Sequence, residues 1–247
     1  MIHAASSVDE TADIVFCKYL KGDRVIRFFH KIPASQLVDS RCELLAKLVA
    51  GKSVLHIGCV DSGLTASRIE KGELLHEQLA KQATRLCGID VDGVGVSLLQ
   101  SYGFKDLYIV TPDQASPTTE LFDIVLAGEV LEHVSNPGEF LDKYMKNIEA
   151  TGAVILTVPN AFCLTTIFRL FVGVETVHED HVAYYSYSTL KRLLQRSNLQ
   201  IDQLFFYSEI NRLSGWKKIL KNVFHKILNV FPQFGEGLVV VASKSRG

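Results

Sequence analysis

Residues 53–64, S-V-L-H-I-G-C-V-D-S-G-L, contain the signal that decides the fold. Three apolar residues (Val54, Leu55 and Ile57) precede a turn that begins at Gly58, and a long helical pattern follows. This order predicts a buried strand, a tight loop and the start of a helix. A turn of this kind presents main-chain N–H groups and the positive end of a helix dipole to a ligand.

Alternating elements continue along the chain. Apolar runs predict strands at 54–57, 86–89, 107–110, 123–127, 153–158, 199–207 and 238–242. Helical patterns lie at 35–50, 64–84, 94–102, 138–149 and 188–197. This alternation predicts an α/β fold with a doubly wound, largely parallel sheet. We expect a helical or irregular N-terminal cap over 1–34 and one α/β domain over 35–247.

Composition excludes some classes of protein. The 247-residue chain has 26 basic and 27 acidic residues and a formal net charge of −1, so we expect no nucleic-acid partner. Its 5 cysteines are dispersed, which is typical of reduced thiols and a cytoplasmic location. The N-terminus lacks a basic start followed by an apolar run, and no apolar stretch approaches ~18 residues. We therefore expect neither a signal peptide nor a membrane-spanning helix.

The second predicted strand ends in an acid, Asp90. A carboxylate at this position can accept hydrogen bonds from both hydroxyls of a ribose. The three glycines of a dinucleotide-binding turn correspond here to Gly58, Val60 and Gly63, and Val60 would crowd a pyrophosphate. Asp90 also comes later than the spacing of about 20 residues that is typical of that fold. Both features favour a nucleoside cofactor without a pyrophosphate, although a turn without a ligand gives the same pattern.

Two further segments follow predicted strands. Asp113 and Gln114 come after the third strand, where a carboxylate and a main-chain N–H can bind an adenine ring. The pair Pro112-Asp113 is also common in β-turns, so a plain turn without a ligand explains these residues equally well. After the fourth strand, Gly128 lets the main chain pass close to a ligand, and His133 offers a proton acceptor. A polar residue that anchors the loop explains His133 equally well.

The chain resembles the class I S-adenosylmethionine-dependent methyltransferases, in their small-molecule branch, over roughly residues 44–206 and the last strand. The motifs that carry the resemblance are, in order, V-L-H-I-G-C-V-D-S-G, C-G-I-D, P-D, F-D-I-V-L-A-G-E-V-L-E-H-V-S-N-P and I-L-T-V-P-N-A-F. The resemblance implies an enzyme that uses S-adenosyl-L-methionine. It also implies a Rossmann-like, seven-stranded sheet with an antiparallel last strand and a lid insertion over about 160–187, after the fifth strand.

The resemblance implies a cofactor site as well. It places His56, Gly58 and Cys59 at the methionine part, Asp90 at the ribose, Asp113 and Gln114 at the adenine, and Gly128 and Glu129 beside the sulfonium, with Val91 as a further cofactor-binding residue. The chain departs from the family at His56, where an acid is common, and at Val60 and Ser62, where glycine is common. A neutral imidazole attracts an ammonium less than a carboxylate does. A binding or scaffold protein that keeps the fold without turnover is therefore the alternative.

Residues 174–187, V-E-T-V-H-E-D-H-V-A-Y-Y-S-Y, hold further candidates for catalysis. His178 and His181 have two acids between them, and a neighbouring carboxylate can orient an imidazole and raise its basicity. Together with His133 they are the candidate catalytic residues, although histidines that anchor a loop explain the pattern too. An H-x-x-H pair needs a third ligand to hold a metal. The spacing identifies none, so we expect no metal site.

The acceptor is less well defined than the cofactor. We expect methyl transfer to the oxygen of a small-molecule or glycan-type acceptor. Residues 216–230 form a basic amphipathic pattern, which is typical of a helix packed on its own domain and also of peripheral membrane contact. A nicotinamide-dependent oxidoreductase is disfavoured by Val60 and by the late position of Asp90. The pattern indicates neither the oligomeric state nor the identity of the acceptor.

Overall fold

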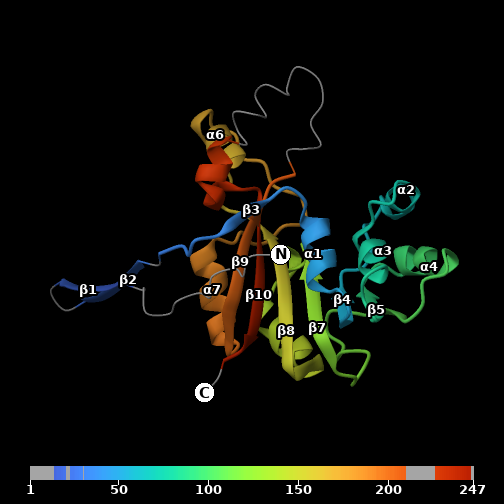
Figure 1. Cartoon of the computed structure of the whole chain (residues 1–247). Helices are drawn as coiled ribbons and strands as arrows, with labels where there is room; N and C mark the ends of the chain where they lie inside the picture. The colour runs from blue at the N-terminus through green and yellow to red at the C-terminus, as the bar shows by residue number, and fades with distance from the viewer. Residues whose placement is uncertain (1–13, 21–22, 30, 210–225, 246–247) are drawn as a thin grey trace.

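The computed structural model describes residues 14–20, 23–29, 31–209 and 226–245. Its centre is an eight-stranded sheet of order β3-β9-β10-β8-β7-β4-β5-β6 (Figure 1). The strand bounds are β3 Gln36–Val38, β4 Ser53–Ile57, β5 Arg85–Asp90, β6 Leu107–Ile109, β7 Phe122–Gly128, β8 Ile148–Pro159, β9 Leu199–Tyr207 and β10 Gly237–Lys244. Strand β10 is antiparallel to both of its neighbours, β8 and β9, and the other pairs in this sheet are parallel.

The predicted fold class is confirmed, with one correction to the number of strands. The seven strands β4 to β10 form the predicted mostly parallel sheet with an antiparallel last strand. The short strand β3 adds an eighth at the edge, because Gln36–Val38 pairs in parallel with the end of β9.

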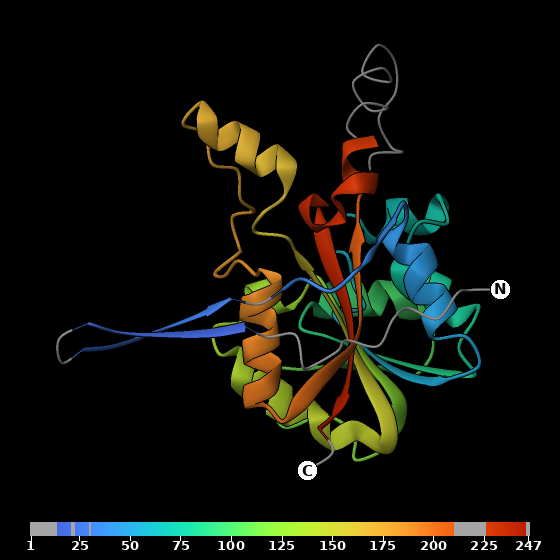
Figure 2. The ribbon, with the colours of Figure 1, turned by 60° about the vertical axis from the view of Figure 1, so that its left-hand side comes forward.

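Helices cover both faces of the sheet (Figures 1 and 2). Their bounds are α1 Arg41–Leu48, α2 Thr65–Glu70, α3 Leu75–Ala80, α4 Gly93–Ser101, α5 Pro137–Tyr144, α6 Leu164–Phe171 and α7 Tyr187–Arg196. Leu45 of α1 and Leu79 of α3 belong to the core on one face, and Leu141 of α5 and Leu194 of α7 belong to the core on the other. A strand that is covered on both faces has apolar residues throughout, which explains the unbroken apolar runs in the sequence.

The N-terminal prediction is wrong where the structure describes it. In place of a helical or irregular cap, Ile14–Leu20 (β1) and Asp23–Phe29 (β2) form an antiparallel pair that projects away from the main sheet (Figures 1 and 2). Both segments are rich in Val, Ile, Phe and Tyr, which favour strands. The helix predicted at 35–50 begins only at Arg41, where Ser40 caps it by accepting the Glu43 N–H at 3.2 Å.

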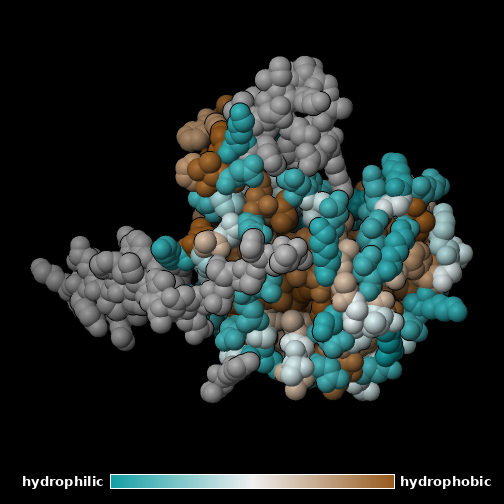
Figure 3. Space-filling view, viewed as in Figure 1, coloured by the Kyte–Doolittle hydropathy of each residue, from teal (hydrophilic) through white to brown (hydrophobic). Residues whose placement is uncertain are grey.

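The insertion after β8 is present, and α6 lies within it. No residue of α6 is buried, and the helix stands away from the sheet (Figure 2). Its exposed side chains include Phe171, which is 82% exposed, and hydrophobic residues gather there in Figure 3. The insertion is tied to the sheet by a bridge between Asn160 and Tyr185, and the Tyr185 hydroxyl donates to the Leu131 carbonyl at 3.3 Å.

The basic amphipathic helix predicted at 216–230 lies largely outside the described residues. Residues 226–230 are helical, and Leu228 is buried. Across the described residues, no helix is both long enough and apolar enough to span a membrane.

Candidate active site

The residues predicted to bind a cofactor lie at or just after the carboxyl ends of β4, β5, β6 and β7. Strand β4 lies between β5 and β7, so the chain crosses to one side of β4 and later to the other. Open α/β sheets bind ligands outside the carboxyl ends of the strands at such a reversal. The topology therefore brings the predicted residues to the edge where a cofactor is expected.

The loop after β4 depends on Gly58. This residue has a φ of +73°, and a Cβ there would lie 2.5 Å from Val130 Cγ2, so only glycine fits. The N–H groups of Gly58 and Cys59 both donate to the Ile89 carbonyl, at 2.9 and 3.3 Å. The expectation that these amides are free for a ligand is therefore wrong in this structure. The loop can still offer carbonyl oxygens, which suit an ammonium group.

Asp90 joins this loop to the end of β5. One carboxylate oxygen accepts the Val60 N–H at 2.9 Å, and the other accepts the Asp92 N–H at 3.0 Å. Asp90 is nearly buried, and burial raises the pKa of its carboxyl group. Each carboxylate oxygen keeps a second lone pair, so Asp90 can still accept from ribose hydroxyls. Val91, which follows it, is 63% exposed.

The valine at position 60 is accommodated by a glycine in α4. A Cβ at Gly95 would lie only 2.1 Å from Val60 Cγ1, so the Val60 side chain packs directly over the first turn of this helix. Asp92 caps the same turn by accepting the N–H groups of Val94 and Gly95, both at 3.0 Å. The departure from the usual glycine at position 60 is thus matched by a glycine where the side chain needs room.

His56 lies inside the protein against a second histidine. The Nδ1 atoms of His56 and His76 are 3.1 Å apart, the rings are stacked, and each residue is 1% exposed. One imidazole must donate and the other accept, so the accepting ring is neutral. Burial lowers the pKa of His76 to about 4 and that of His56 well below its ordinary value. The His56 ring therefore has a protein partner where the family commonly has an acid.

Residues 111–114 form a closed turn after β6. The Gln114 N–H donates to the Thr111 carbonyl, and the Gln114 side-chain oxygen accepts the Thr111 N–H, both at 3.2 Å. The amide predicted to bind adenine is thus used within the turn, which corrects that expectation. Asp113 is exposed beside it.

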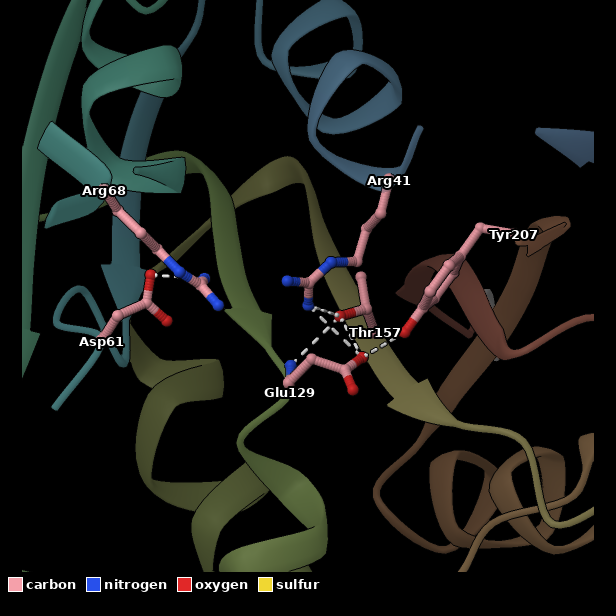
Figure 4. Close-up of polar contacts among 6 residues, drawn as sticks. All are labelled: Arg41, Asp61, Arg68, Glu129, Thr157 and Tyr207. Atoms are coloured by element: carbon pink, nitrogen blue, oxygen red, sulfur yellow. Dashed lines mark hydrogen bonds and ion pairs between the residues drawn. The ribbon is translucent and has the colours of Figure 1, made fainter. Parts of the chain in front are cut away.

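Glu129 is the centre of a polar cluster that sequence reasoning did not find (Figure 4). Its Oε1 accepts the hydroxyl protons of Thr157, at 2.9 Å, and Tyr207, at 3.0 Å. The Arg41 guanidinium lies 3.4 Å from the same oxygen and also donates to Thr157 Oγ1 at 3.1 Å. Burial opposes the charge of Arg41, but nearby groups, Glu129 first, outweigh it and raise its pKa. We call these four residues the Glu129 cluster.

One sequence signal for this cluster was available. Thr157 lies near the carboxyl end of β8, and Tyr207 ends β9, so both are polar residues at the edge that carries Asp90. Arg41 gave no such signal, because it is the first residue of a helix whose start was placed too early. Glu129 itself has a φ of 56°, an unusual conformation for a residue other than glycine.

Glu132 lies in the short turn η2 (Leu131–His133) beside the Glu129 cluster. It is fully buried, and burial together with the negative charge of Glu129 raises the pKa of its carboxyl group to about 8. Its carbonyl oxygen accepts the N–H groups of Val182 and Ala183, at 2.9 and 3.2 Å. These two bonds hold the insertion against the segment that contains His133.

The three predicted catalytic histidines come together at this point. The ring centroid of His133 lies 4.6 Å from that of His181 and 5.9 Å from that of His178, and the last two are 5.3 Å apart. His133 and His178 are exposed, and His181 is partly buried. Burial and the two neighbouring imidazoles lower the pKa of His181, and Glu129 is close enough to act against them. The sequence suggested all three as candidate catalytic residues, but the spacing along the chain did not show that His133 meets the other two.

Comparison with known proteins defines the class. A family model described as a methyltransferase domain matches residues 28–204. The ubiquinone biosynthesis O-methyltransferase of Azoarcus sp. (strain BH72) is 28% identical over 180 residues, which are 68% of this chain and 70% of that protein. The mitochondrial protein of the same name from Arabidopsis thaliana is 27% identical over 208 residues, which are 74% of this chain and 55% of that protein.

Solved structures agree on the fold. A putative S-adenosylmethionine-dependent methyltransferase from Listeria monocytogenes has a TM-score of 0.55 at 14% identity, over 83% of this chain and 96% of that chain. One from Mesorhizobium loti has a TM-score of 0.52 at 14% identity, over 83% and 98%. The chain spans 57% of the length of its Schizosaccharomyces pombe relative, another mitochondrial ubiquinone biosynthesis O-methyltransferase.

The chain belongs to the methyltransferase domain family. The resemblance drawn from its motifs is confirmed: it is a class I S-adenosylmethionine-dependent methyltransferase. The match to a methyltransferase domain rules out the alternative considered from the sequence, a nicotinamide-dependent oxidoreductase.

The contact between Val60 and Gly95 gives a prediction with a diagnostic sign. An alanine for glycine within a helix normally stabilises it by about 0.5–1 kcal/mol. Here Gly95→Ala should lower the free energy of unfolding by about 1–3 kcal/mol, because the new methyl group meets Val60. Urea unfolding measures this change. The double variant Val60→Ala with Gly95→Ala should recover most of the loss, and a stabilised single variant would contradict the contact.

The buried pair His56–His76 predicts how stability depends on pH. Both histidines have lowered pKa values in the folded protein, whereas in the unfolded chain they take up protons near pH 6.5. As pH falls through this range the unfolded chain binds more protons, so stability falls by up to about 1.4 kcal/mol per pH unit for each histidine. His76→Gln should make this slope shallower in urea unfolding between about pH 7 and about pH 5. An unchanged slope would contradict the neutral pair.

Proposed function

We propose that this methyltransferase transfers the methyl group of S-adenosyl-L-methionine to a hydroxyl oxygen of a small-molecule or glycan-type acceptor. The observation that carries the proposal is the convergence of His133, His178 and His181 beside Glu129, just after the carboxyl end of β7. The names of the relatives, which are O-methyltransferases, support oxygen as the accepting atom.

The groups at the strand ends suit the cofactor. The carboxylate of Asp90 is an acceptor for ribose hydroxyls, and the carbonyl oxygens after β4 are acceptors for an ammonium. Because Gly58 has no Cβ, the main chain can take the positive φ that this loop requires. Bound S-adenosylmethionine supplies a methyl group attached to a sulfonium. When the methyl group is transferred, the sulfur leaves as a neutral thioether.

The remaining work of the site is positioning and removal of a proton. Holding the acceptor oxygen in line with the methyl carbon supplies much of the rate of a displacement. The hydroxyl must also lose its proton, and the histidine cluster is the part of the site that lowers the cost of that loss. The Glu129 cluster has a positioning role, because Tyr207 and Thr157 donate to the carboxylate and Arg41 neutralises it.

The insertion supplies His178 and His181, whereas the cofactor side is built from the ends of β4 to β7 and the turns that follow them. The acceptor is therefore recognised between the insertion and the strand ends. This division explains why the cofactor motifs are legible in the sequence while the identity of the acceptor is not.

The first test concerns the ribose contact. Asp90→Ala should weaken binding of S-adenosylmethionine by more than about 1.5 kcal/mol, roughly tenfold or more, because charge-assisted hydrogen bonds are lost. Calorimetric titration measures this affinity. Asp123→Ala is a matched control, because Asp123 accepts the main-chain and side-chain protons of Ser53 at the opposite ends of β4 and β7, both at 2.8 Å. Equal affinities of the two variants would contradict the ribose assignment.

The second test concerns the reaction. With a tritium-labelled methyl donor and a panel of phenols, catechols, sugars, amines and thiols, we expect label in an ether product. His181→Ala should lower kcat by about 100-fold or more with little change in cofactor affinity. Glu179→Gln, a change at an exposed neighbour, is the control.

Other outcomes of this assay are equally informative. Label found only on nitrogen or sulfur would contradict the choice of oxygen. Cofactor binding without any transfer across the panel would favour a binding protein that keeps the fold. A His181→Ala protein that loses activity only in proportion to its folded fraction would make His181 an anchor of the loop.

A further inference from the structure

The histidine cluster has the composition of a metal centre. One nitrogen from each of His133, His178 and His181 lies within 4.8 Å of the others. We propose that these three imidazoles bind a divalent transition-metal ion of the zinc class, at the entrance where the insertion meets the strand ends. The role suggested for this ion below rests on the proposed methyl transfer, but its binding does not.

Main-chain hydrogen bonds bring the three ligands together. The Glu132 carbonyl, one residue before His133, accepts the N–H groups of Val182 and Ala183, the two residues after His181. A tight turn then places His178, because the His181 N–H donates to the His178 carbonyl at 3.1 Å. The convergence therefore follows from the main chain of two segments that are distant in sequence, and not from chance rotamers of exposed side chains.

The geometry needs only small side-chain adjustments. Tetrahedral zinc with Zn–N bonds of about 2.0–2.1 Å places ligand nitrogens about 3.4 Å apart. The nitrogens of the cluster are at most 4.8 Å apart, so movements of about 1 Å by imidazoles that are exposed or only partly buried suffice. The T-shaped and tilted ring arrangements turn the three imidazoles in different directions, as ligands around one ion require.

The ligand set selects the kind of ion. Three neutral nitrogens suit Zn²⁺ and its neighbours in the first transition row, whereas Mg²⁺ and Ca²⁺ prefer oxygen. Three protein ligands also leave a coordination position open, as in catalytic rather than structural zinc sites. Asp180 flanks His178: its N–H donates to His178 Nδ1 at 3.3 Å, and its carboxylate lies 3.7 Å from the same nitrogen. When the other nitrogen of His178 binds an ion, Nδ1 carries the proton, and a small rotation of the ring turns Nδ1 from the Asp180 N–H to the Asp180 carboxylate, which accepts that proton.

Such an ion has a role in the proposed reaction. An acceptor hydroxyl in the open position would be more acidic and would release its proton to water. The oxygen would then form the bond to the methyl carbon as the carbon–sulfur bond breaks and the electron pair stays on sulfur.

The test uses the full chain, freed of metal and without cofactor or acceptor. Titration with Co²⁺ should give one bound ion per chain with the strong visible absorption of a tetrahedral site, and Zn²⁺ should displace it. His133→Ala, His178→Ala and His181→Ala should each weaken binding tenfold or more, and Asp180→Asn should weaken it about tenfold. Glu179→Gln, the matched control, should leave binding unchanged.

Three results would overturn the proposal: no stoichiometric Co²⁺ or Zn²⁺ binding, a preference for Mg²⁺, or full affinity in His133→Ala. Thermal unfolding and titration with S-adenosylhomocysteine check that each variant is folded. Removal of metal should abolish methyl transfer, and Zn²⁺ should restore it. Activity that survives chelation but is lost in His181→Ala would contradict the role of the ion in the reaction while leaving the proposed methyl transfer intact.

Discussion

The carboxylate of Glu129 is the contact on which the arrangement of the site depends. One of its oxygens receives hydrogen bonds from Thr157 and Tyr207 and faces the buried guanidinium of Arg41, so one helix and three strand ends meet at a single atom. A buried cation requires such a partner, and the partner in turn fixes the chain just after β7. The turn that carries His133 starts two residues later, and its position follows from this anchor.

Sequence predicted the parts of the fold whose signals are local. Strands β4, β5 and β7 are apolar on both faces, and each lies close to its predicted range. Strand β3 has only three residues and exists because it pairs with β9, a partner that no local pattern reveals. The predicted helix at 64–84 is divided into α2 and α3, a break that its continuous periodicity hid.

The site divides in the same way. Asp90 and Gly58 were legible because each follows an apolar run directly, and the structure places both at the same edge. The hydrogen bonds of this loop could not be predicted from the sequence. Its main-chain N–H groups donate to Ile89 and to Asp90, and only the pairing of β4 with β5 brings these acceptors within reach. His133 meets the insertion because the N–H groups of Val182 and Ala183 donate to the Glu132 carbonyl. These residues are about 50 positions apart, so spacing along the chain could not reveal the contact.

The way in which the insertion is attached has a consequence for how this protein can diversify. Helix α6 buries none of its residues, and the contacts of the insertion with the rest of the fold lie at its two ends, among them the bonds of Asn160 to the 233–236 segment, the Tyr185 hydroxyl and the Glu132 carbonyl. Residues 164–177, which lie between these points and before the two histidines, can change in length and character with little cost to the central sheet. The donor half of the enzyme can thus stay constant while the acceptor half is replaced, and new chemistry can arise from exchange of one surface module.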